Sequence, residues 1–437
     1  MANRIYGADW VVPVASEPLR DAVVAVEGSR IAWLGPEAKL PPQFRAVDID
    51  WTDGVITPGL VNAHTHLQYS GFNALGRGQY RGFEDWSVAF EALYDRETWE
   101  WGRAAAQGAK LGLATGTTVF SEIITSDEAR GAIAAAQASG IEYLEVIAET
   151  TRSWTNGGRE ELIKWLGDKA TITTGISPHA PYNLDPCVVS DLVELARSRG
   201  IRLHTHLGES ALEEAFYLTG DPAVLFIYGD LRDEYHLVRQ KGSGLKTAAY
   251  ADSVGLLGEC THIAHGVYFD KCQRDLLRQR KTRVALCPRS NAVIGLAEAP
   301  VAAYLSEGHD IAVGTDSLAS APSLDLMADV KALAEIARKQ GYREGDLWTR
   351  LVQAATSGGA RALGMAKRGY GALIEGGPAD LAIFAIDVTG DEVERALVEQ
   401  GEGRCVLTVA QGRVVHDGRD KASEIERHVR SQDQQAP

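Results

Sequence analysis

Two histidines, His64 and His66, are separated by one residue in an apolar stretch that begins near Val55. Side chains alternate between the two faces of a strand, so both imidazoles are expected on the same face. Neutral imidazole is a common ligand of divalent metal ions, and a fixed pair supplies half of a metal site. The spacing therefore predicts half of such a site, with the remaining ligands coming from elsewhere in the chain.

Most of the chain's eleven histidines fall near the ends of apolar segments. A lone histidine in such a segment is usually a core residue, and an aspartate after Gly-Thr can simply cap a helix. The recurrence of the pattern favours one shared site instead. The residues concerned are His64, His66, His179, His204, His206, Glu209, His262, His265 and Asp316.

The residues from 57 to 365 alternate apolar strands with helical stretches, which predicts an α/β fold and a (β/α)8 TIM barrel. Barrels of this kind carry their chemistry at the C-terminal ends of the strands. The long segment 211–258 is expected to supply helices and an active-site loop. The expected strands are Val55–His66, Thr117–Ile123, Ile141–Glu149, Thr171–His179, Ile201–Glu209, Cys260–Tyr268, Thr282–Pro288 and Asp310–Asp316.

Both chain ends carry short alternating strands around glycine turns, as in the stretch before and after Gly28. The same pattern returns in 379–384, 404–410 and 413–416. We therefore predict a small β-sandwich domain built from residues 1–56 and 366–437, next to the barrel domain of residues 57–365.

Composition excludes several classes of function. The formal net charge of −15 disfavours a nucleic-acid partner, which would require a basic face. No apolar run approaches the length of a membrane span, and the first ten residues lack the apolar core of a signal peptide. Five cysteines without a Cys-x-x-Cys pair favour a reducing compartment. We expect a cytoplasmic enzyme that acts on a small molecule and contacts neither nucleic acid nor membrane.

Four motifs occur in the order and on the strands typical of one family: His64-Thr-His66, His206-Leu-Gly-Glu209, Ala-His265-Gly and Asp316. The chain resembles the amidohydrolase superfamily, specifically its mononuclear aminohydrolase, or deaminase, branch. The resemblance covers the barrel, and the β-rich ends match the family's accessory domain. It implies a homodimer.

The resemblance implies one divalent metal ion, held by His64, His66, His206 and Asp316 with a position left for water. Two-metal members carry a lysine at the end of strand four, where this chain reads Thr173-Thr-Gly-Ile-Ser-Pro-His179. We expect Zn²⁺, with Fe²⁺ as the alternative, since both accept this ligand set.

The same resemblance assigns the catalytic groups. His265 and Asp316 would hold the attacking water and take its proton, and Glu209 would protonate a ring nitrogen before ammonia leaves. The alternative for Glu209 is an acid in the first turn of a helix. His204 is expected to be a buried residue of a second layer. His262 and His265, three residues apart, cannot both face inward on a regular strand, so we assign the role to His265.

The closest resemblance is to nucleoside-type deaminases that act on S-adenosylhomocysteine, 5′-methylthioadenosine and 6-aminodeoxyfutalosine. It carries a substrate contact to His179, in Ser177-Pro-His-Ala-Pro-Tyr, and a ribose-binding acid to Glu84, in Phe83-Glu-Asp-Trp86. Loop packing is the alternative for both residues.

The segments Asn62–Ser70 and Cys287–Asn291 most resemble the aminodeoxyfutalosine deaminases of menaquinone biosynthesis, whose substrate ends in a benzoate. A cation is therefore expected at the far end of the pocket, within aromatic walls. The candidate cations are Arg152, Arg289, Arg77 and Arg81, and the candidate aromatics are Trp86, Tyr69, Phe90 and Trp154.

Deamination of S-adenosylhomocysteine or 5′-methylthioadenosine is the first alternative. A triazine-type chlorohydrolase would share the metal ligands but would not need Glu84. A non-enzymatic scaffold is disfavoured because no ligand is missing, and a cyclic-amide hydrolase is disfavoured by the missing strand-four lysine.

Overall fold

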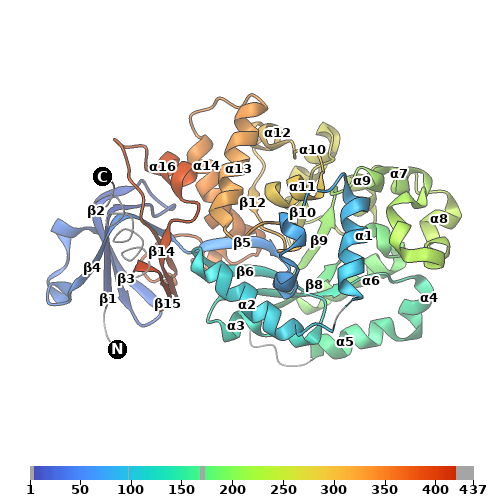
Figure 1. Cartoon of the computed structure of the whole chain (residues 1–437), viewed down its shortest axis with the longest axis horizontal. Coiled ribbons are helices and arrows are strands. Elements are labelled where there is room, and N and C mark those ends of the chain that lie inside the picture. The colour runs from blue at the N-terminus through green and yellow to red at the C-terminus, as the bar shows by residue number, and fades with distance from the viewer. Residues whose placement is uncertain (1–3, 97, 168–172, 420–437) are drawn as a thin grey trace, which may run out of the picture.

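The computed structural model describes residues 4–96, 98–167 and 173–419 (Figure 1). Eight parallel strands follow one another around a nearly closed barrel, and a bridge between Thr65 and Asp316 links its first strand to the segment after its last. All eight predicted barrel strands are confirmed, and all but β6 are somewhat shorter than expected, although residues 171 and 172 of the fourth predicted strand lie outside the described ranges. They are β5 (Leu60–Thr65), β6 (Thr117–Ile124), β7 (Ser139–Val146), β8 (Thr173–Pro178), β9 (Leu203–Leu207), β10 (Thr261–His265), β11 (Arg283–Leu286) and β12 (Ile311–Val313).

Strands β5, β6, β7, β9 and β10 are buried at every residue, as expected when helices cover a parallel barrel from outside. Figure 1 shows helices such as α2, α6 and α13 around the strands. The helices of the described residues are α1 (Phe83–Tyr94), α2 (Trp101–Ala114), α3 (Ala132–Ala135), α4 (Thr151–Ser153), α5 (Arg159–Gly167), α6 (Pro186–Arg199), α7 (Leu212–Thr219), α8 (His236–Gln240), α9 (Thr247–Ser253), α10 (Lys271–Arg280), α11 (Pro288–Ile294), α12 (Val301–Ser306), α13 (Leu326–Lys339), α14 (Leu347–Gln353), α15 (Gly359–Ala362) and α16 (Val393–Gln400).

Helix α6 illustrates how local sequence sets these boundaries. Pro186 occupies its first turn, where the missing N–H is not needed. Gly200 ends the helix in the left-handed region, with φ of 64°, which glycine adopts without steric cost. The apolar residues of α6 then pack in one hydrophobic core with residues of the barrel strands.

The two chain ends meet in one seven-stranded mixed sheet, in the order β15-β14-β13-β4-β1-β2-β3. The antiparallel pairing of β4 with β13 joins the N-terminal strands to the C-terminal strands, and β4 leads through Gly59 into the barrel. The prediction that both ends build one β-rich unit is therefore confirmed. The strands are β1 (Arg4–Val11), β2 (Leu19–Glu27), β3 (Arg30–Pro36), β4 (Ile49–Pro58), β13 (Leu381–Phe384), β14 (Cys405–Ala410) and β15 (Arg413–Asp417).

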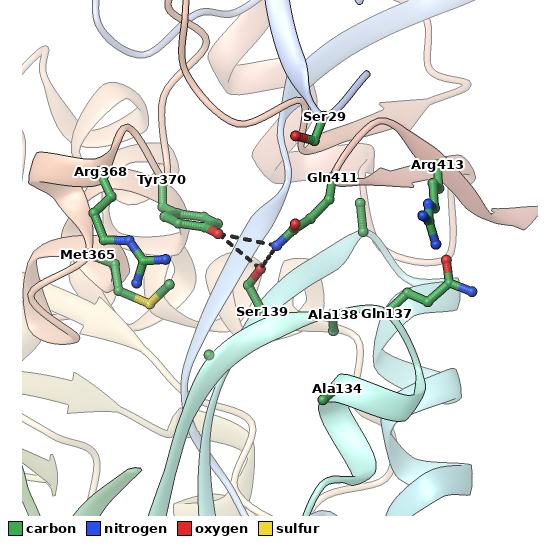
Figure 2. Close-up of a pocket in the computed structure, with 12 residues that line it drawn as sticks. Ser29, Ala134, Gln137, Ala138, Ser139, Met365, Arg368, Tyr370, Gln411 and Arg413 are labelled. Atoms are coloured by element: carbon green, nitrogen blue, oxygen red, sulfur yellow. Dashed lines mark hydrogen bonds between the residues drawn. The ribbon is translucent and has the colours of Figure 1, made fainter. Parts of the chain in front are cut away.

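A groove of about 820 Å³ lies where the small sheet meets the N-terminal ends of the barrel strands (Figure 2). Gln411 Nε2, at the turn between β14 and β15, donates to Ser139 Oγ at 2.6 Å and to the Tyr370 hydroxyl at 3.3 Å. Because Ser139 begins β7, this groove lies at the opposite end of the barrel from the histidines. Its bonded cluster ties the two units together.

The segment between β9 and β10 forms short helices, as predicted, including the 3₁₀ segment Pro222–Glu234. Helices α7 and α8 of this segment lie at the end of the molecule opposite the small sheet (Figure 1). Within the described ranges, no helix has the length and apolar character that a membrane crossing requires.

Candidate metal centre

The ends of β5 and β9 and the residues after β12 bring His64, His66, His206 and Asp316 together. His66 Nε2 lies 3.2 Å from His206 Nε2, and Asp316 Oδ1 lies 3.5 Å from His64 Nε2 and 3.8 Å from His66 Nε2. Ligands placed tetrahedrally at about 2.0–2.1 Å from one ion lie roughly 3.4 Å from each other. The four buried side chains therefore have the spacing of ligands around a single ion.

Hydrogen bonds behind the ligands determine which ring nitrogens carry protons. His204 Nδ1 lies 3.0 Å from the His262 carbonyl oxygen and must donate to it, so His204 Nε2 accepts from His64 Nδ1 at 2.7 Å. His206 Nδ1 donates to the His179 carbonyl oxygen at 2.7 Å. Each of the two ligand imidazoles thus presents an unprotonated Nε2 to the centre, as metal binding requires. His204 occupies the supporting layer that the sequence predicts.

A buried nitrogen without a hydrogen-bond partner is a second observation that indicates a cation site. His64 Nε2 is buried and has no hydrogen-bond partner among the described residues, which is unusual for a buried polar atom. Burial lowers the pKa of His64 well below its ordinary value and lowers that of His66 to about 3. Both rings are therefore neutral at physiological pH, and the donor set of imidazoles and one carboxylate suits Zn²⁺ or Fe²⁺.

The two oxygens of Asp316 face different partners. Oδ2 accepts hydrogen bonds from Ser290 Oγ and Ser320 Oγ, both at 2.7 Å, which leaves Oδ1 to face the histidines. Burial acts to raise the pKa of Asp316, but the contact with His64 outweighs it and holds that pKa well below the ordinary value. Asp316 is therefore ionised and oriented by its two serine partners.

His265 and Glu209 face each other beside this centre, with His265 Nε2 3.5 Å from Glu209 Oε1. His265 Nδ1 donates to Asn291 Oδ1 at 3.0 Å, so its Nε2 is free to accept a proton. Burial raises the pKa of the Glu209 carboxyl to about 7, a value suited to giving up a proton near neutral pH. The pair thus places a proton acceptor and a proton donor next to the ligands.

Backbone conformation at the strand ends is unusual. His265 and Asp316 adopt φ of 72° and 59°, a region that costs side-chain-bearing residues about 1–3 kcal/mol. The turn at His265 also allows both histidines of β10 to reach the barrel interior. His262 stacks on His204 at 3.8 Å and its Nε2 lies 3.1 Å from the Ala63 carbonyl oxygen. The sequence expectation assumed a regular strand, and β10 is no longer regular at His265.

Glu213 is a residue that the sequence reading missed. Its carboxylate accepts three backbone N–H groups, from Gly208 at 2.8 Å, Glu209 at 2.7 Å and Ser210 at 2.9 Å. The first turn of α7 therefore holds the loop that carries Glu209. The acid that serves the helix start is Glu213, whereas Glu209 precedes the helix and faces His265.

A cavity of about 220 Å³ opens from His66, His206 and Asp316 toward solvent. His179 lines it, with its ring 4.7 Å from that of His206. The Asn183 amide donates to His179 Nδ1 at 2.8 Å, which leaves Nε2–H as a donor toward the cavity. Trp86 also lines the cavity and is fixed by a 2.9 Å bond from its Nε1 to the Ala319 carbonyl oxygen. Tyr69 and Phe90, two further predicted aromatic residues, also line the cavity.

The structure does not bring several predicted substrate contacts to this cavity. Glu84 is exposed on α1 and is not among the described lining residues, and Arg152 is exposed on α4. Arg77 and Arg81 are exposed as well, and Arg81 pairs with Asp85. Trp154 is buried in the core, where its Nε1 donates to Asp191. Side chains on one helix or loop can point in any direction around it, and spacing alone does not fix that direction.

Arg289 is also directed away from the cavity. Its guanidinium donates to Asp329 Oδ2 through Nε at 3.0 Å and Nη2 at 2.8 Å, and to Ser323 Oγ through Nη1 at 2.9 Å. Asp329 is fully buried on α13. The arginine therefore neutralises a buried carboxylate and joins α11 to α13, which is a structural role in place of the predicted substrate contact.

Replacing Arg289 with methionine is expected to lower the free energy of unfolding by about 3–5 kcal/mol, because Asp329 is left buried without its partner. Urea denaturation followed by circular dichroism measures the change. The double variant Arg289→Met/Asp329→Leu, which removes both charges, is the matched control and should regain part of the loss. If the unfolding midpoint were unchanged and KM for a carboxylated substrate were raised, the result would instead support the predicted substrate contact of Arg289.

Two further acids line the cavity that the sequence reading did not single out, Glu91 on α1 and Glu145 near the end of β7. Glu145 lies in a predicted barrel strand close to its C-terminal end, so the same rule that found the histidines could have identified it. Glu91 carries no comparable signal, because only the packing of α1 against the barrel turns it toward the cavity.

Known proteins resemble this chain over most of its length. A 5-methylthioadenosine/S-adenosylhomocysteine deaminase of Moorella thermoacetica is 30% identical over 415 residues, 91% of this chain and 90% of its own. An adenosine deaminase from Xanthomonas campestris, solved with bound zinc, superposes with a TM-score of 0.78 at 22% identity and covers 98% of both chains. The aminofutalosine deaminase of Helicobacter pylori gives a TM-score of 0.72 at 19% identity, over 94% of this chain and 100% of its own. These two likenesses establish the fold.

The family model described as the amidohydrolase family matches residues 55–415. This range contains the complete barrel together with the C-terminal strands of the small sheet. The resemblance noted from the histidine motifs is confirmed: the chain belongs to the amidohydrolase family, as a hydrolase that acts on C–N bonds.

Proposed function

We propose that this protein is a metal-dependent aminohydrolase that replaces the exocyclic amino group of an adenine-nucleoside-type substrate with oxygen and releases ammonia. The observation that carries the proposal is the convergence of three groups on one point at the ligand cluster. Asp316 Oδ1 faces His64 and His66, and His265 Nε2 faces Glu209. Ring deamination needs a proton acceptor and a proton donor next to the attacked carbon.

The proposed ligands are His64, His66, His206 and Asp316, and one Zn²⁺ per chain is the expected ion. When bound, such an ion supplies an acidified water at neutral pH. No lysine is present at the end of β8, which supports a single ion. Metal analysis by mass spectrometry is expected to give one ion per chain and to distinguish zinc from iron.

The remaining steps belong to the chain's own groups. His265 Nε2 and Asp316 Oδ1 accept the proton of the attacking water, and Glu209 donates a proton to the ring nitrogen next to the attacked carbon. His179 Nε2–H points to the cavity and would hold the substrate base. The proton taken from the water then passes to the amino group, the C–N bond breaks and ammonia leaves, and the hydroxyl proton on the attacked carbon returns to Glu209 as the carbonyl forms.

Two observations favour different nucleosides as the substrate. The relative from Moorella thermoacetica favours 5′-methylthioadenosine or S-adenosylhomocysteine. The sequence motifs favour 6-aminodeoxyfutalosine, with the Helicobacter pylori structure in support of the fold alone. The four arginines considered for its benzoate do not line the cavity among the described residues. We also expect a cytoplasmic homodimer. The five free cysteines support a reducing compartment, and light scattering measures the oligomeric state.

Ammonia release from adenosine, 5′-methylthioadenosine, S-adenosylhomocysteine and 6-aminodeoxyfutalosine tests the proposed reaction directly. We expect turnover of at least one nucleoside, together with the matching inosine-type product. A chlorotriazine serves as the contrasting substrate. Release of chloride from it, with no ammonia from any nucleoside, would show the alternative chlorohydrolase activity instead.

A further inference from the structure

The cavity next to the metal ligands is acidic and aromatic in character. The described residues that line it include four carboxylates, Glu91, Glu145, Glu209 and Asp316, and no lysine or arginine. Asp316 and Glu209 belong to the proposed chemistry, whereas Glu91 and Glu145 have no part in it.

Glu145 lines the cavity and has one carboxylate oxygen without a hydrogen-bond partner among the described residues. Its residue is 9% exposed, and its Oε2 accepts a 2.7 Å hydrogen bond from Thr125 Oγ1. Its Oε1 is buried and lacks a hydrogen-bond partner within the described part of the chain. Thr125 is itself held through its backbone N–H by Gln68 Oε1 at 3.1 Å. The free oxygen is thus fixed in place, and a substrate O–H or N–H would satisfy it.

Helix α1 supplies the outer wall of the cavity. Trp86, Phe90 and Tyr94 follow one another at intervals of four residues, so their rings lie along one face of the helix. The rings of Trp86 and Phe90 lie 5.3 Å apart, and those of Phe90 and Tyr94 lie 6.0 Å apart. Glu91, half-buried, adds a carboxylate beside this aromatic face.

We propose that this cavity selects adenine nucleosides whose 5′ substituent is uncharged and apolar, and that Glu91 and Glu145 exclude substituents that end in a carboxylate. The inference rests on the deaminase function proposed above and names its substrate class. Aromatic rings offer an apolar surface to a small alkyl or thioether group. A carboxylate placed there would lose its water without gaining a cation, and would face the acidic side chains of Glu91 and Glu145.

Steady-state kinetics with three nucleosides tests this selection. 5′-Methylthioadenosine is neutral, whereas 6-aminodeoxyfutalosine carries a benzoate. We expect kcat/KM to be about 100-fold higher for 5′-methylthioadenosine than for 6-aminodeoxyfutalosine. S-adenosylhomocysteine, a zwitterion, should fall between them. Equal or better turnover of the benzoate substrate overturns the inference and leaves the deaminase function standing.

Absence of turnover with all three substrates would contradict the proposed function. Calorimetric binding of the same compounds to the zinc-loaded protein then still decides the selectivity. Tighter binding of 5′-methylthioadenosine than of 6-aminodeoxyfutalosine supports it, and the reverse order overturns it.

Charge reversal at the outer wall provides the sharper test. Glu91→Arg is expected to raise kcat/KM for 6-aminodeoxyfutalosine by about 10-fold, because a cation replaces a repelling carboxylate. Glu344→Arg makes the same charge change in the exposed loop before α14 and is the matched control. Equal effects of the two variants on the ratio of the two substrates would overturn the role of Glu91.

Glu145→Gln tests the inner acid. The amide keeps the bond to Thr125 but is a weaker acceptor, so KM for 5′-methylthioadenosine should rise about 10-fold while kcat changes little. Glu145→Asp retains the charge and should rescue the KM in part. Loss of kcat with unchanged KM would exclude a specificity role for Glu145, and thermal melting of each variant verifies its fold.

Discussion

The Asp316→Asn variant is expected to keep the barrel fold and to lose about 10³- to 10⁴-fold in kcat. Asparagine can still accept the bonds from Ser290 and Ser320 that orient residue 316, which lie at 2.7 Å. It cannot take up a proton, and its neutral oxygen binds a divalent cation less strongly than a carboxylate. The measurements are kcat at saturating nucleoside and metal content per chain.

Asp380→Asn is the matched control for this substitution. Asp380 is a buried aspartate of the small sheet whose Oδ1 accepts the Gln411 backbone N–H at 2.6 Å. It lies outside the catalytic cavity, so its replacement should alter the unfolding midpoint but leave kcat unchanged. Normal kcat in Asp316→Asn with a full complement of metal would refute the proton-accepting role of Asp316.

The second large effect is expected at Glu209. The Glu209→Gln variant should lose about 10²- to 10⁴-fold in kcat while its metal content stays at the level of the parent. Glutamine has nearly the same shape but has no carboxyl proton to give to the ring nitrogen. Burial raises the pKa of Glu209 to about 7, which keeps that proton in place near neutral pH in the parent.

Glu142→Gln is the matched control, because it replaces a buried glutamate that has no part in the proposed chemistry. Glu142 is also buried, and burial raises the pKa of its carboxyl to about 7. It accepts the Gly131 backbone N–H at 2.6 Å, away from the metal ligands. Its replacement should therefore change the unfolding midpoint and not kcat. Should Glu209→Gln lose its metal together with its activity, the loss would reflect the metal site and not proton donation.

Periodicity predicted the strands of this protein because parallel barrel strands are buried on both sides and are apolar along their length. Two histidine pairs interrupt this apolar pattern: His64 with His66 at the end of β5, and His204 with His206 in β9. Eight parallel strands bring such ends into one place, so strand order predicted one shared histidine site, and the family resemblance selected His64, His66, His206 and Asp316 within it.

The parts of the site on helices and loops did not follow in this way. Arg289 is next in sequence to Ser290, whose hydroxyl donates to Asp316. Its guanidinium nevertheless turns away to Asp329 on α13. Glu84 and Glu91 both lie on α1, and only Glu91 lines the cavity. Successive residues of a helix point about 100° apart around its axis, and packing decides which direction faces the barrel.

The sequence by itself therefore determined the α/β barrel and the absence of a strand-four lysine, because these depend on residue type and on the period of a strand, and it proposed the candidate metal ligands through the family resemblance. Tertiary structure alone decided the proton positions on His64 and His204, the burial that shifts the Glu209 pKa, and the acidic aromatic wall of the cavity. These features arise between side chains distant in sequence, whose separation only the packed barrel defines.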